Sequence, residues 1–355
     1  MLGADGVRLA DINGDGLPDI ATGWEEGRRV RIYYHPPKKE ARSASAWRSE
    51  TVGNACAAED AVFVDLDSDG RMDVVSSCED SQPTGVYVHW APDWKTDRLL
   101  LPRTKRWIYA LPMKLQGQKD PVLFLGGKEP DADLMLMRRP VFGSPRDLSR
   151  WNATKIGKMG WTMSMIERDM DNDGDLDVLI SDRKGTQSGI FWLEAPLWTR
   201  HDVGGDGEEL MFIDIAKDPT KDRRNGDVIA AAIRPNTIAL FTRPKDPREH
   251  WERKDIPYPP QAGTAKAVAL GDLDNNGRLD IALTCENAGG GKEGVWWLES
   301  KADGSWVPHR ISGREGIKFD RIELLDVDGD GDLDLLTTEE RFPLGVIWYE
   351  NPRRL

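Results

Sequence analysis

The sequence predicts an all-β fold assembled from a repeated unit, and three observations support this prediction. Short runs rich in Val, Ile, Leu and Trp alternate with clusters of Gly, Asp, Asn and Pro along all 355 residues, while helical periodicity is nearly absent. One acidic pattern recurs five times at a regular interval. Apolar, strand-like residues flank every copy, as in Ala61-Val62-Phe63-Val64 before one of them. Periodicity of this kind indicates a repeat architecture.

The five acidic segments share the pattern Asp-x-Asp/Asn-x-Asp/Asn-Gly-x-x-Asp. They occupy residues 11–19, 65–73, 169–177, 272–280 and 326–334. Their first aspartates are 54, 104, 103 and 54 residues apart, so each long interval is about twice 52 residues. Each long interval should therefore contain a further unit that lacks the acidic pattern. Leu111–Leu125 and Phe212–Ala232 show the strand rhythm expected of these two units.

Seven units of about 52 residues account for the chain and predict a single domain, residues 1–355, folded as a seven-bladed β-propeller. The expected blades are 1–46, 47–93, 94–150, 151–197, 198–250, 251–305 and 306–355. A Trp opens the fourth strand of six units and is expected to pack between blades: Trp47, Trp94, Trp151, Trp198, Trp251 and Trp306. The last unit ends after its third strand. We infer that a segment upstream of Met1 supplies the missing strand; the alternative is a three-stranded closing blade with an open edge.

The spacing of oxygen-bearing side chains in the acidic segments predicts calcium binding. Positions 1, 3, 5 and 9 carry them, and the position 7 carbonyl and a water would complete the six or seven oxygens that Ca²⁺ prefers. Gly at position 6 permits the tight turn, and without a cation the carboxylates would repel one another. An EF-hand is excluded because strands flank the loops and the Glu at position 12 is absent. About five Ca²⁺ ions are expected, at Asp11, Asn13, Asp15, Leu17, Asp19, Asp65, Asp67, Asp69, Arg71, Asp73, Asp169, Asp171, Asp173, Asp175, Asp177, Asp272, Asp274, Asn276, Arg278, Asp280, Asp326, Asp328, Asp330, Asp332 and Asp334.

These motifs resemble the FG-GAP/VCBS repeats of integrin-type and bacterial seven-bladed propellers, over nearly the whole chain. The resemblance implies the propeller fold and the calcium sites. It does not select a function, because such propellers include adhesion modules, domains of secreted proteins, sugar lyases and dehydratases.

Composition narrows the partners and the compartment. The net charge is −13, and five bound Ca²⁺ would leave −3, so the acidity mainly reflects the loops. The sequence has no stripe of basic residues of the kind that binds nucleic acids. It also has no apolar run long enough for membrane insertion. Calcium loops of modest affinity favour an extracytoplasmic protein, periplasmic or secreted, with its signal peptide upstream or removed. Among three cysteines, Cys56 and Cys78 are placed to form a disulfide, and Cys285 is expected to be a small buried residue.

Strand direction places the ligand site on the face opposite the calcium loops, here called the mouth. The innermost strand of each unit runs into the loop and the second strand returns, so residues before the first and after the second strand share that face. The predicted ligand-binding residues are Trp24, Glu25, Glu59, Asp60, Trp107, Lys128, Trp161, Asp182, Lys184, Glu209, Arg234, Glu286, Lys318, Asp320 and Glu339. Aromatic rings beside charges suit a carbohydrate, and Arg or Lys would hold a carboxylate or phosphate.

Several functions remain open at this point. The five histidines fall in third or fourth strands, away from the mouth, which departs from the sugar lyases and dehydratases that commonly use His or Tyr. The candidate catalytic residues for a β-elimination are Lys266, Arg321, Tyr109, Arg183 and Glu79. The alternatives are a module that binds a carbohydrate or a protein, a purely structural scaffold, and a metal-dependent hydrolase. For the last, Glu25, Glu79, Glu286, Asn287 and Glu339 would hold a cation in the central channel.

Overall fold

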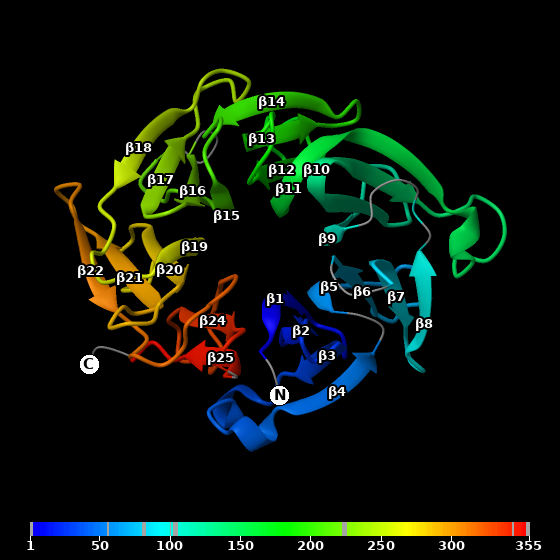
Figure 1. Ribbon diagram of the computed structural model, residues 1–355, viewed down its shortest axis with the longest axis horizontal. Coiled ribbons are helices and arrows are strands. Elements are labelled where there is room, and N and C mark those ends of the chain that lie inside the picture. Colours follow the sequence, from blue (N-terminus) through cyan, green and yellow to red (C-terminus); the bar gives the residue numbers. More distant parts are fainter. Residues whose placement is uncertain are drawn as a thin grey trace.

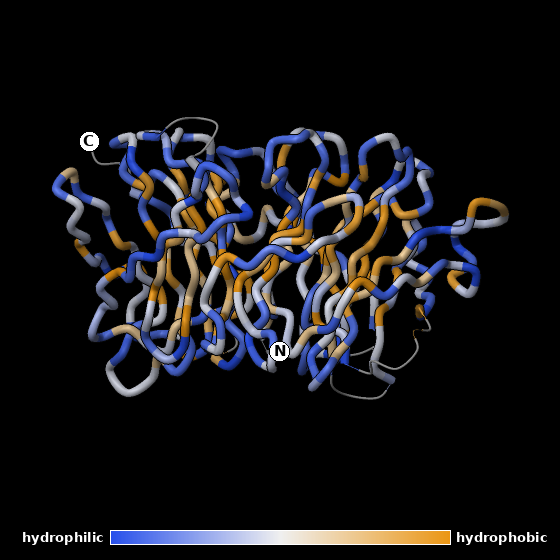
Figure 2. The backbone as a smooth tube through the Cα atoms, turned by 90° about the horizontal axis from the view of Figure 1, so that it is seen from above, coloured by the Kyte–Doolittle hydropathy of each residue, from blue (hydrophilic) through white to orange (hydrophobic). Residues whose placement is uncertain are grey.

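The computed structural model describes residues 3–54, 57–79, 83–99, 101, 106–221, 226–342 and 344–352. Its antiparallel sheets stand around a central channel, with the first strand of each sheet nearest the channel (Figure 1). In the side view the middle of the ring is rich in apolar residues, and hydrophilic segments lie along both faces (Figure 2). Among the described residues, no helix has the length and hydropathy to span a bilayer.

The strands follow one another in chain order within each sheet. The first sheet contains β1 (Asp5–Ala10), β2 (Asp19–Trp24), β3 (Arg29–Tyr34) and β4 (Arg48–Gly53), and the second contains β5 (Ala58–Val64), β6 (Asp73–Cys78), β7 (Gly85–Trp90) and β8 (Lys95–Leu99). A six-stranded sheet follows, with β9 (Trp107–Met113), β10 (Val122–Arg138), β11 (Asn152–Arg168), β12 (Asp177–Asp182), β13 (Gly189–Glu194) and β14 (Thr199–Gly204). The next two sheets contain β15 (Leu210–Lys217), β16 (Asp227–Ile233), β17 (Thr237–Thr242) and β18 (Glu252–Ile256), then β19 (Thr264–Gly271), β20 (Asp280–Glu286), β21 (Val295–Ser300) and β22 (Trp306–Arg310). The last sheet contains β23 (Glu323–Leu325), β24 (Asp334–Glu339) and β25 (Gly345–Tyr349), and short 3-10 helices span Lys38–Glu40, Ala44–Ala46 and Leu148–Arg150.

The prediction of seven blades was wrong, because the described strands form six sheets. The third and fourth predicted units share the sheet β9–β14. β10 and β11 are each 17 residues long. They pair with one another from Lys128↔Trp161 to Arg138↔Asn152. The remaining part of β10 pairs with β9, and that of β11 pairs with β12. The backbone passes the expected strand boundary through register shifts rather than a turn, so the two units stay hydrogen-bonded as one blade.

Other features of the repeat agree with the sequence. The last described sheet has three strands, and each recurrent Trp stands directly before or at the start of an outer strand. Val7 and Ile20 of the first sheet pack against Leu336 of the last, which closes the ring. Cys78 is disulfide-bonded, while its predicted partner Cys56 lies outside the described residues. Cys285 is free and buried, as expected.

Candidate functional site

Each acidic loop joins an innermost strand to the second strand of its sheet. Positive φ angles at positions 4 and 6 make the turn, as at Asn172 (63°) and Gly174 (99°). The first aspartate accepts the position 6 N–H, at 2.7 Å for Asp272 and Gly277. These local bonds fold the carboxylates toward the centre of the loop.

The last aspartate of each loop ties the loop to the third strand of its sheet. Asp73 accepts the N–H of Leu66 (3.1 Å) within the loop and that of Ala91 (2.8 Å) just after β7. The equivalent pair of bonds recurs in the other four loops, at Asp19, Asp177, Asp280 and Asp334. The loop is therefore already shaped by its own backbone before any cation enters.

The donor set of the loops fits a hard divalent cation. In loops 65–73, 169–177 and 272–280, carboxylate oxygens from positions 1, 3 and 9 lie within 4.8 Å of one another. Buried oxygens of Asp169 and Asp175 have no hydrogen-bond partner among the described residues. Burial raises the pKa of Asp73 and Asp177 to about 7. Closely spaced, poorly compensated carboxylates are stabilised by a cation, and a set made only of oxygens matches Ca²⁺.

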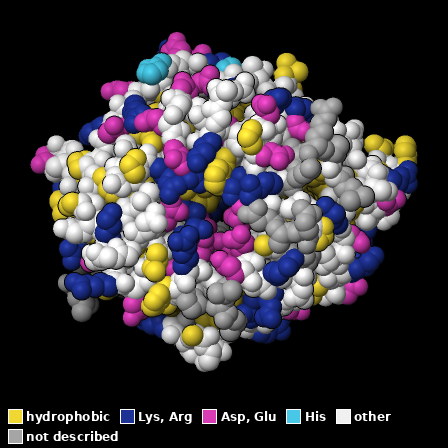
Figure 3. All heavy atoms as spheres, viewed as in Figure 1, with side chains coloured by type: hydrophobic (Ala, Val, Ile, Leu, Met, Phe, Trp, Pro, Cys, Tyr) yellow, Lys and Arg dark blue, Asp and Glu magenta, His cyan; other side chains and the backbone are white. Residues whose placement is uncertain are grey.

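A cavity of about 170 Å³ opens at the mouth, at the opposite ends of the same strands. Eleven predicted mouth residues line it: Glu59, Asp60, Tyr109, Lys128, Trp161, Arg183, Lys266, Glu286, Lys318, Asp320 and Arg321. Figure 3 shows basic and acidic side chains gathered around the central opening of this face. A cavity needs about 10–15 Å³ to hold one water molecule, so this cavity has room for several waters or one small polar ligand.

A bulge near the mouth end of each of five innermost strands brings an additional residue to the cavity wall, and four of these residues carry a side chain. Register shifts occur between Asp5 and Arg8, Ala58 and Asp60, Thr162 and Ser164, Leu210 and Ile213, and Ala265 and Ala267. The bulged segments contain Gly6, Glu59, Met163, Phe212 and Lys266, and all five line the cavity. Bulges of this kind re-aim side chains at sheet ends.

The sequence analysis missed the apolar part of the cavity wall, which includes Ile108, Met163 and Phe212. A positional signal was available. Glu59, Met163 and Lys266 each stand six residues before the first aspartate of their loop, and so does Asp320. Attention to charged residues alone left Met163 out, although it occupies the same position as Glu59.

Ion pairs run around the cavity and hold its cations in place. Arg183 pairs with Glu209, Arg234 pairs with Glu209 and Glu286, and Lys128 pairs with Glu79. Burial alone would raise the pKa of Glu209, but the neighbouring guanidinium and ammonium groups hold it at about 2. The wall therefore presents fixed charges of both signs rather than mobile side chains.

Tyr109 lies between two guanidinium groups at the base of the cavity. Arg321 donates to the Tyr109 hydroxyl oxygen, and the Arg8 guanidinium lies 4.3 Å from the ring centroid. Arg8 in turn pairs with Asp60 at 3.0 Å. Arg8 was not among the predicted residues because it lies inside β1, one bulge beyond the strand end.

Some predicted mouth residues lie elsewhere, and these predictions need correction. Trp24 and Trp107 are 8% and 1% exposed and belong to the packed interior. Asp182 is buried and accepts the N–H groups of Gly160 and Trp161, so it positions Trp161. Glu339 is buried and accepts the N–H groups of Ile317 and Lys318. The carboxylates of Asp182 and Glu339 thus accept backbone hydrogen bonds at the ends of their strands and are not available to a ligand. Glu25, Lys184, Glu209 and Arg234 also lie outside the cavity wall, and the last three belong to the ion pairs around it.

Trp161 does line the cavity, but cations lie against its ring. The Lys128 ammonium and the Arg183 guanidinium are 4.1 and 4.0 Å from the indole centroid, and the Lys184 ammonium is 5.3 Å away. The expected stacking of a sugar on this ring therefore competes with cation–π contacts.

Two groups at the mouth have pKa shifts in opposite directions. Glu79 is 2% exposed; burial, and then the Glu59 charge, raises the pKa of Glu79 to about 8. Burial, and then the charge of Lys266, lowers the pKa of Lys318. Glu59 and Lys318 line the same cavity. Titratable groups whose environments separate their pKa values are the usual acid and base of a site.

The raised pKa of Glu79 should be visible in how the free energy of unfolding depends on pH. The folded state keeps the Glu79 proton up to about pH 8, whereas an unfolded glutamate loses it near its ordinary pKa of 4.5. This group therefore makes stability fall as the pH rises between these values. We expect Glu79→Gln to reduce the loss of stability between pH 5 and pH 9, measured by urea unfolding in saturating Ca²⁺. Glu208→Gln, at a surface glutamate paired with Arg253, is the control, and equal pH dependence in Glu79→Gln and wild type would contradict the assignment.

Comparisons with known proteins give two similarities. Residues 11–76 match a family model described as FG-GAP-like repeat, a span that contains the first two acidic loops. The chain is also 23% identical over 235 residues to aldos-2-ulose dehydratase from Phanerodontia chrysosporium. That alignment covers 58% of this chain and 25% of the relative, so the chain corresponds to about a quarter of that protein's length. The chain is thus a β-propeller that carries FG-GAP-like repeat sequence.

Proposed function

We propose that this protein is a carbohydrate-binding β-propeller whose mouth cavity takes one polyhydroxylated ring. The observation that carries the proposal is the cavity of about 170 Å³, lined by fixed charges of both signs and by an apolar wall. Sugar hydroxyls both donate and accept hydrogen bonds, so they suit a wall that offers ammonium, guanidinium and carboxylate groups together. The apolar wall faces the C–H groups of a ring, as in concave ligand sites generally.

The acidic loops are proposed to hold Ca²⁺ through the carboxylates at positions 1, 3 and 9. Bound calcium would offset two of the negative charges of each loop and hold the two inner strands together at the end away from the mouth. Loops of modest affinity fill where calcium is millimolar, which supports the proposal that the protein works outside the cytoplasm. Recovery of the native protein in a cytosolic fraction would contradict that location.

A second candidate function is dehydration of a keto sugar in the same cavity. It is favoured by the similarity to a protein named aldos-2-ulose dehydratase and by the opposite pKa shifts of Glu79 and Lys318. Such a reaction removes a proton from the carbon next to the ketone and expels a hydroxyl from the following carbon. The products are an unsaturated ketone and water, so no other reactant is needed.

We propose a role in this elimination for residues in and around the cavity. Lys318 is the base that takes the proton, because burial and the charge of Lys266 favour its neutral form. Arg321, held against Tyr109, faces the developing enolate oxygen. Glu79, whose pKa is raised to about 8 by burial and by the Glu59 charge, is the acid that supplies the proton to the departing hydroxyl.

The test combines binding with product detection. Calcium-loaded protein is titrated calorimetrically with neutral monosaccharides, uronic acids and 2-keto sugars, and the same mixtures are followed by ultraviolet absorbance for the conjugated ketone. Binding of a monosaccharide without absorbance supports the binding module alone. Absorbance growth with a 2-keto sugar supports the dehydratase. Failure of every sugar class to bind would sink both proposals.

A further inference from the structure

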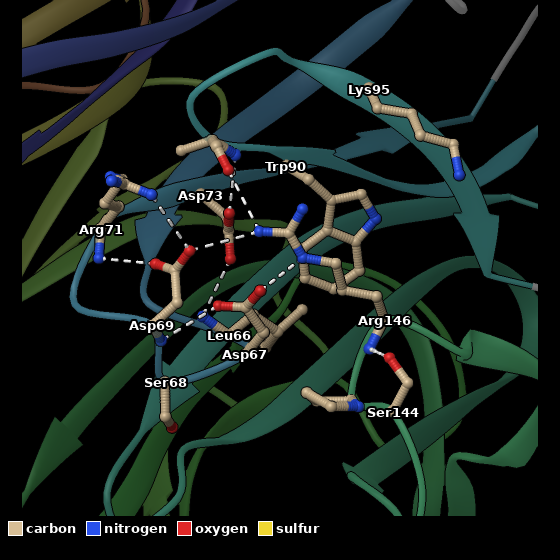
Figure 4. Close-up of polar contacts among 12 residues, drawn as sticks. Leu66, Asp67, Ser68, Asp69, Arg71, Asp73, Trp90, Lys95, Ser144 and Arg146 are labelled. Atoms are coloured by element: carbon tan, nitrogen blue, oxygen red, sulfur yellow. Dashed lines mark hydrogen bonds and ion pairs between the residues drawn. The ribbon is translucent and has the colours of Figure 1, made fainter.

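Three of the five acidic loops receive an arginine from a neighbouring sheet. Arg146 reaches Asp67 at 2.5 Å, Arg248 reaches Asp171 at 2.6 Å, and Arg42 reaches Asp328 at 2.5 Å. In every case the acceptor is the aspartate at position 3 of the loop. These aspartate side chains are 4–6% exposed. Figure 4 shows Arg146 beside Asp67 and Asp69, with Trp90 next to it.

The three arginines come from the same place in the repeat, the connection between a third and a fourth strand. These connections are β3–β4, β10–β11 and β17–β18. In each, the Trp that opens the fourth strand donates its indole N–H to the carbonyl directly before the arginine. The donor–acceptor pairs are Trp47 to Ala41 (2.9 Å), Trp151 to Pro145 (2.8 Å) and Trp251 to Pro247 (3.0 Å). The same arrangement of Trp, connection and arginine thus occurs three times. The recurrent Trp was expected only to pack between blades.

Each arginine also contacts the second strand after the loop (β7, β13 or β25), or the residues just after that strand. The Arg146 guanidinium is 5.2 Å from the Trp90 ring centroid and donates to the Ala91 carbonyl. Arg248 pairs with Glu194 at 2.7 Å. Arg42 pairs with Glu350 at 2.5 Å. One guanidinium therefore joins three segments: its own connection, the acidic loop and the second strand after that loop.

The arginine occurs where the loop carries at least one more aspartate. The three loops that it contacts have Asp at both position 3 and position 5. The other two loops have an Asn at one of these positions, Asn13 or Asn276. Within the described part of the chain, no ion pair reaches loops 11–19 and 272–280. The extra carboxylate and the incoming arginine thus occur together in three loops and are both absent from the other two.

Arg42 lies at the point where the ring closes. It joins the first sheet to Asp328 and Glu350 of the last, and Lys38 pairs with Asp326 of the same loop at 3.3 Å. The last described sheet has three strands, so no fourth strand there reinforces the junction. These ion pairs supplement the Gly3–Glu340 backbone bond of 3.0 Å.

We propose that Arg42, Arg146 and Arg248 are positioning residues that make loops 326–334, 65–73 and 169–177 cation sites shared by adjacent sheets. Each guanidinium binds one oxygen of the position 3 aspartate and leaves the other oxygen to the cation. Cation binding and the docking of the adjacent sheet are then one coupled event. This inference rests on the proposed calcium binding of the loops.

The sign of a mutational effect separates positioning from simple charge neutralisation. If the arginine only neutralises charge, its removal strengthens Ca²⁺ binding, because a repelling cation is lost. If it positions the aspartate, its removal weakens binding, since losing a partner that orients a metal ligand typically costs about 10–100-fold in affinity. We expect the second result for one site in each of Arg42→Gln, Arg146→Gln and Arg248→Gln.

The measurement is calorimetric Ca²⁺ titration of the full chain, with melting temperature as a second readout. Arg253→Gln is the matched control, because this arginine pairs with Glu208 and Asp255 outside the loops. Arg146→Lys keeps the positive charge but loses the planar guanidinium group with its several N–H donors, so it should bind calcium as weakly as Arg146→Gln. The same variant provides the test if Arg146→Gln fails to fold. Unchanged or tighter binding in the Gln variants, or full recovery in the Lys variant, overturns the positioning role alone. A wild-type protein that binds no Ca²⁺ overturns the calcium proposal and this inference together.

Discussion

Removal of calcium is expected to lower the midpoint of thermal unfolding by about 4 °C for each loop that loses its ion. An ion that binds only the folded state at about 100 times its Kd contributes about 2.7 kcal/mol. A chain of 355 residues unfolds with an entropy of roughly 0.75 kcal/mol/K, at about 2.1 cal/mol/K per residue. Five loops together would therefore lower the midpoint by about 18 °C, which differential scanning calorimetry with and without a chelator would detect.

Loop variants make this prediction specific. Asp65→Ala should remove about one fifth of the calcium-dependent shift, whereas Asp255→Ala, at an exposed aspartate outside the loops, should leave it intact. Mg²⁺ should not replace Ca²⁺, because it demands a smaller octahedral site and dehydrates reluctantly. The same midpoint in chelator and in millimolar Ca²⁺ would contradict calcium binding by these loops.

Lys318→Met is expected to abolish most of any dehydratase activity at the mouth. Loss of a positioned general base typically costs about 100- to 10,000-fold in rate. Met keeps much of the length of the side chain, and it also removes the Lys318 nitrogen that contacts Glu340. The rate of absorbance increase with a 2-keto sugar is the measurement, and calorimetry reports whether the sugar still binds.

Lys184→Met is the matched control for this variant. Lys184 is 53% exposed and lies beside the ion pairs of the mouth without lining the cavity. Its substitution should change the rate less than about threefold, as expected for an exposed ion pair worth less than 1 kcal/mol. If Lys318→Met retains the wild-type rate, the base is another group, and Tyr109 is the next to test.

The position of the site could be deduced because it depends on strand direction. Once the acidic loops mark one end of the innermost strands, residues such as Glu59 and Lys266 must lie at the other end. Eleven of the predicted residues line the cavity for this reason. Which of the remaining polar residues point inward could not be deduced, since Asp182 and Glu339 satisfy backbone donors that only the folded chain places beside them.

The sequence by itself determined the repeat, the β-strands and the acidic loops, because each of these features arises within a few consecutive residues. Within nine residues, an Asp-rich loop specifies its own turn, its own hydrogen bonds and its convergent carboxylates. The tertiary structure decided the number of sheets, the bulges that aim Met163 and Phe212 into the cavity, and the contact of Arg42 with Asp328. These features depend on segments far apart in the chain that meet only when the ring closes, so no local pattern of residues encodes them.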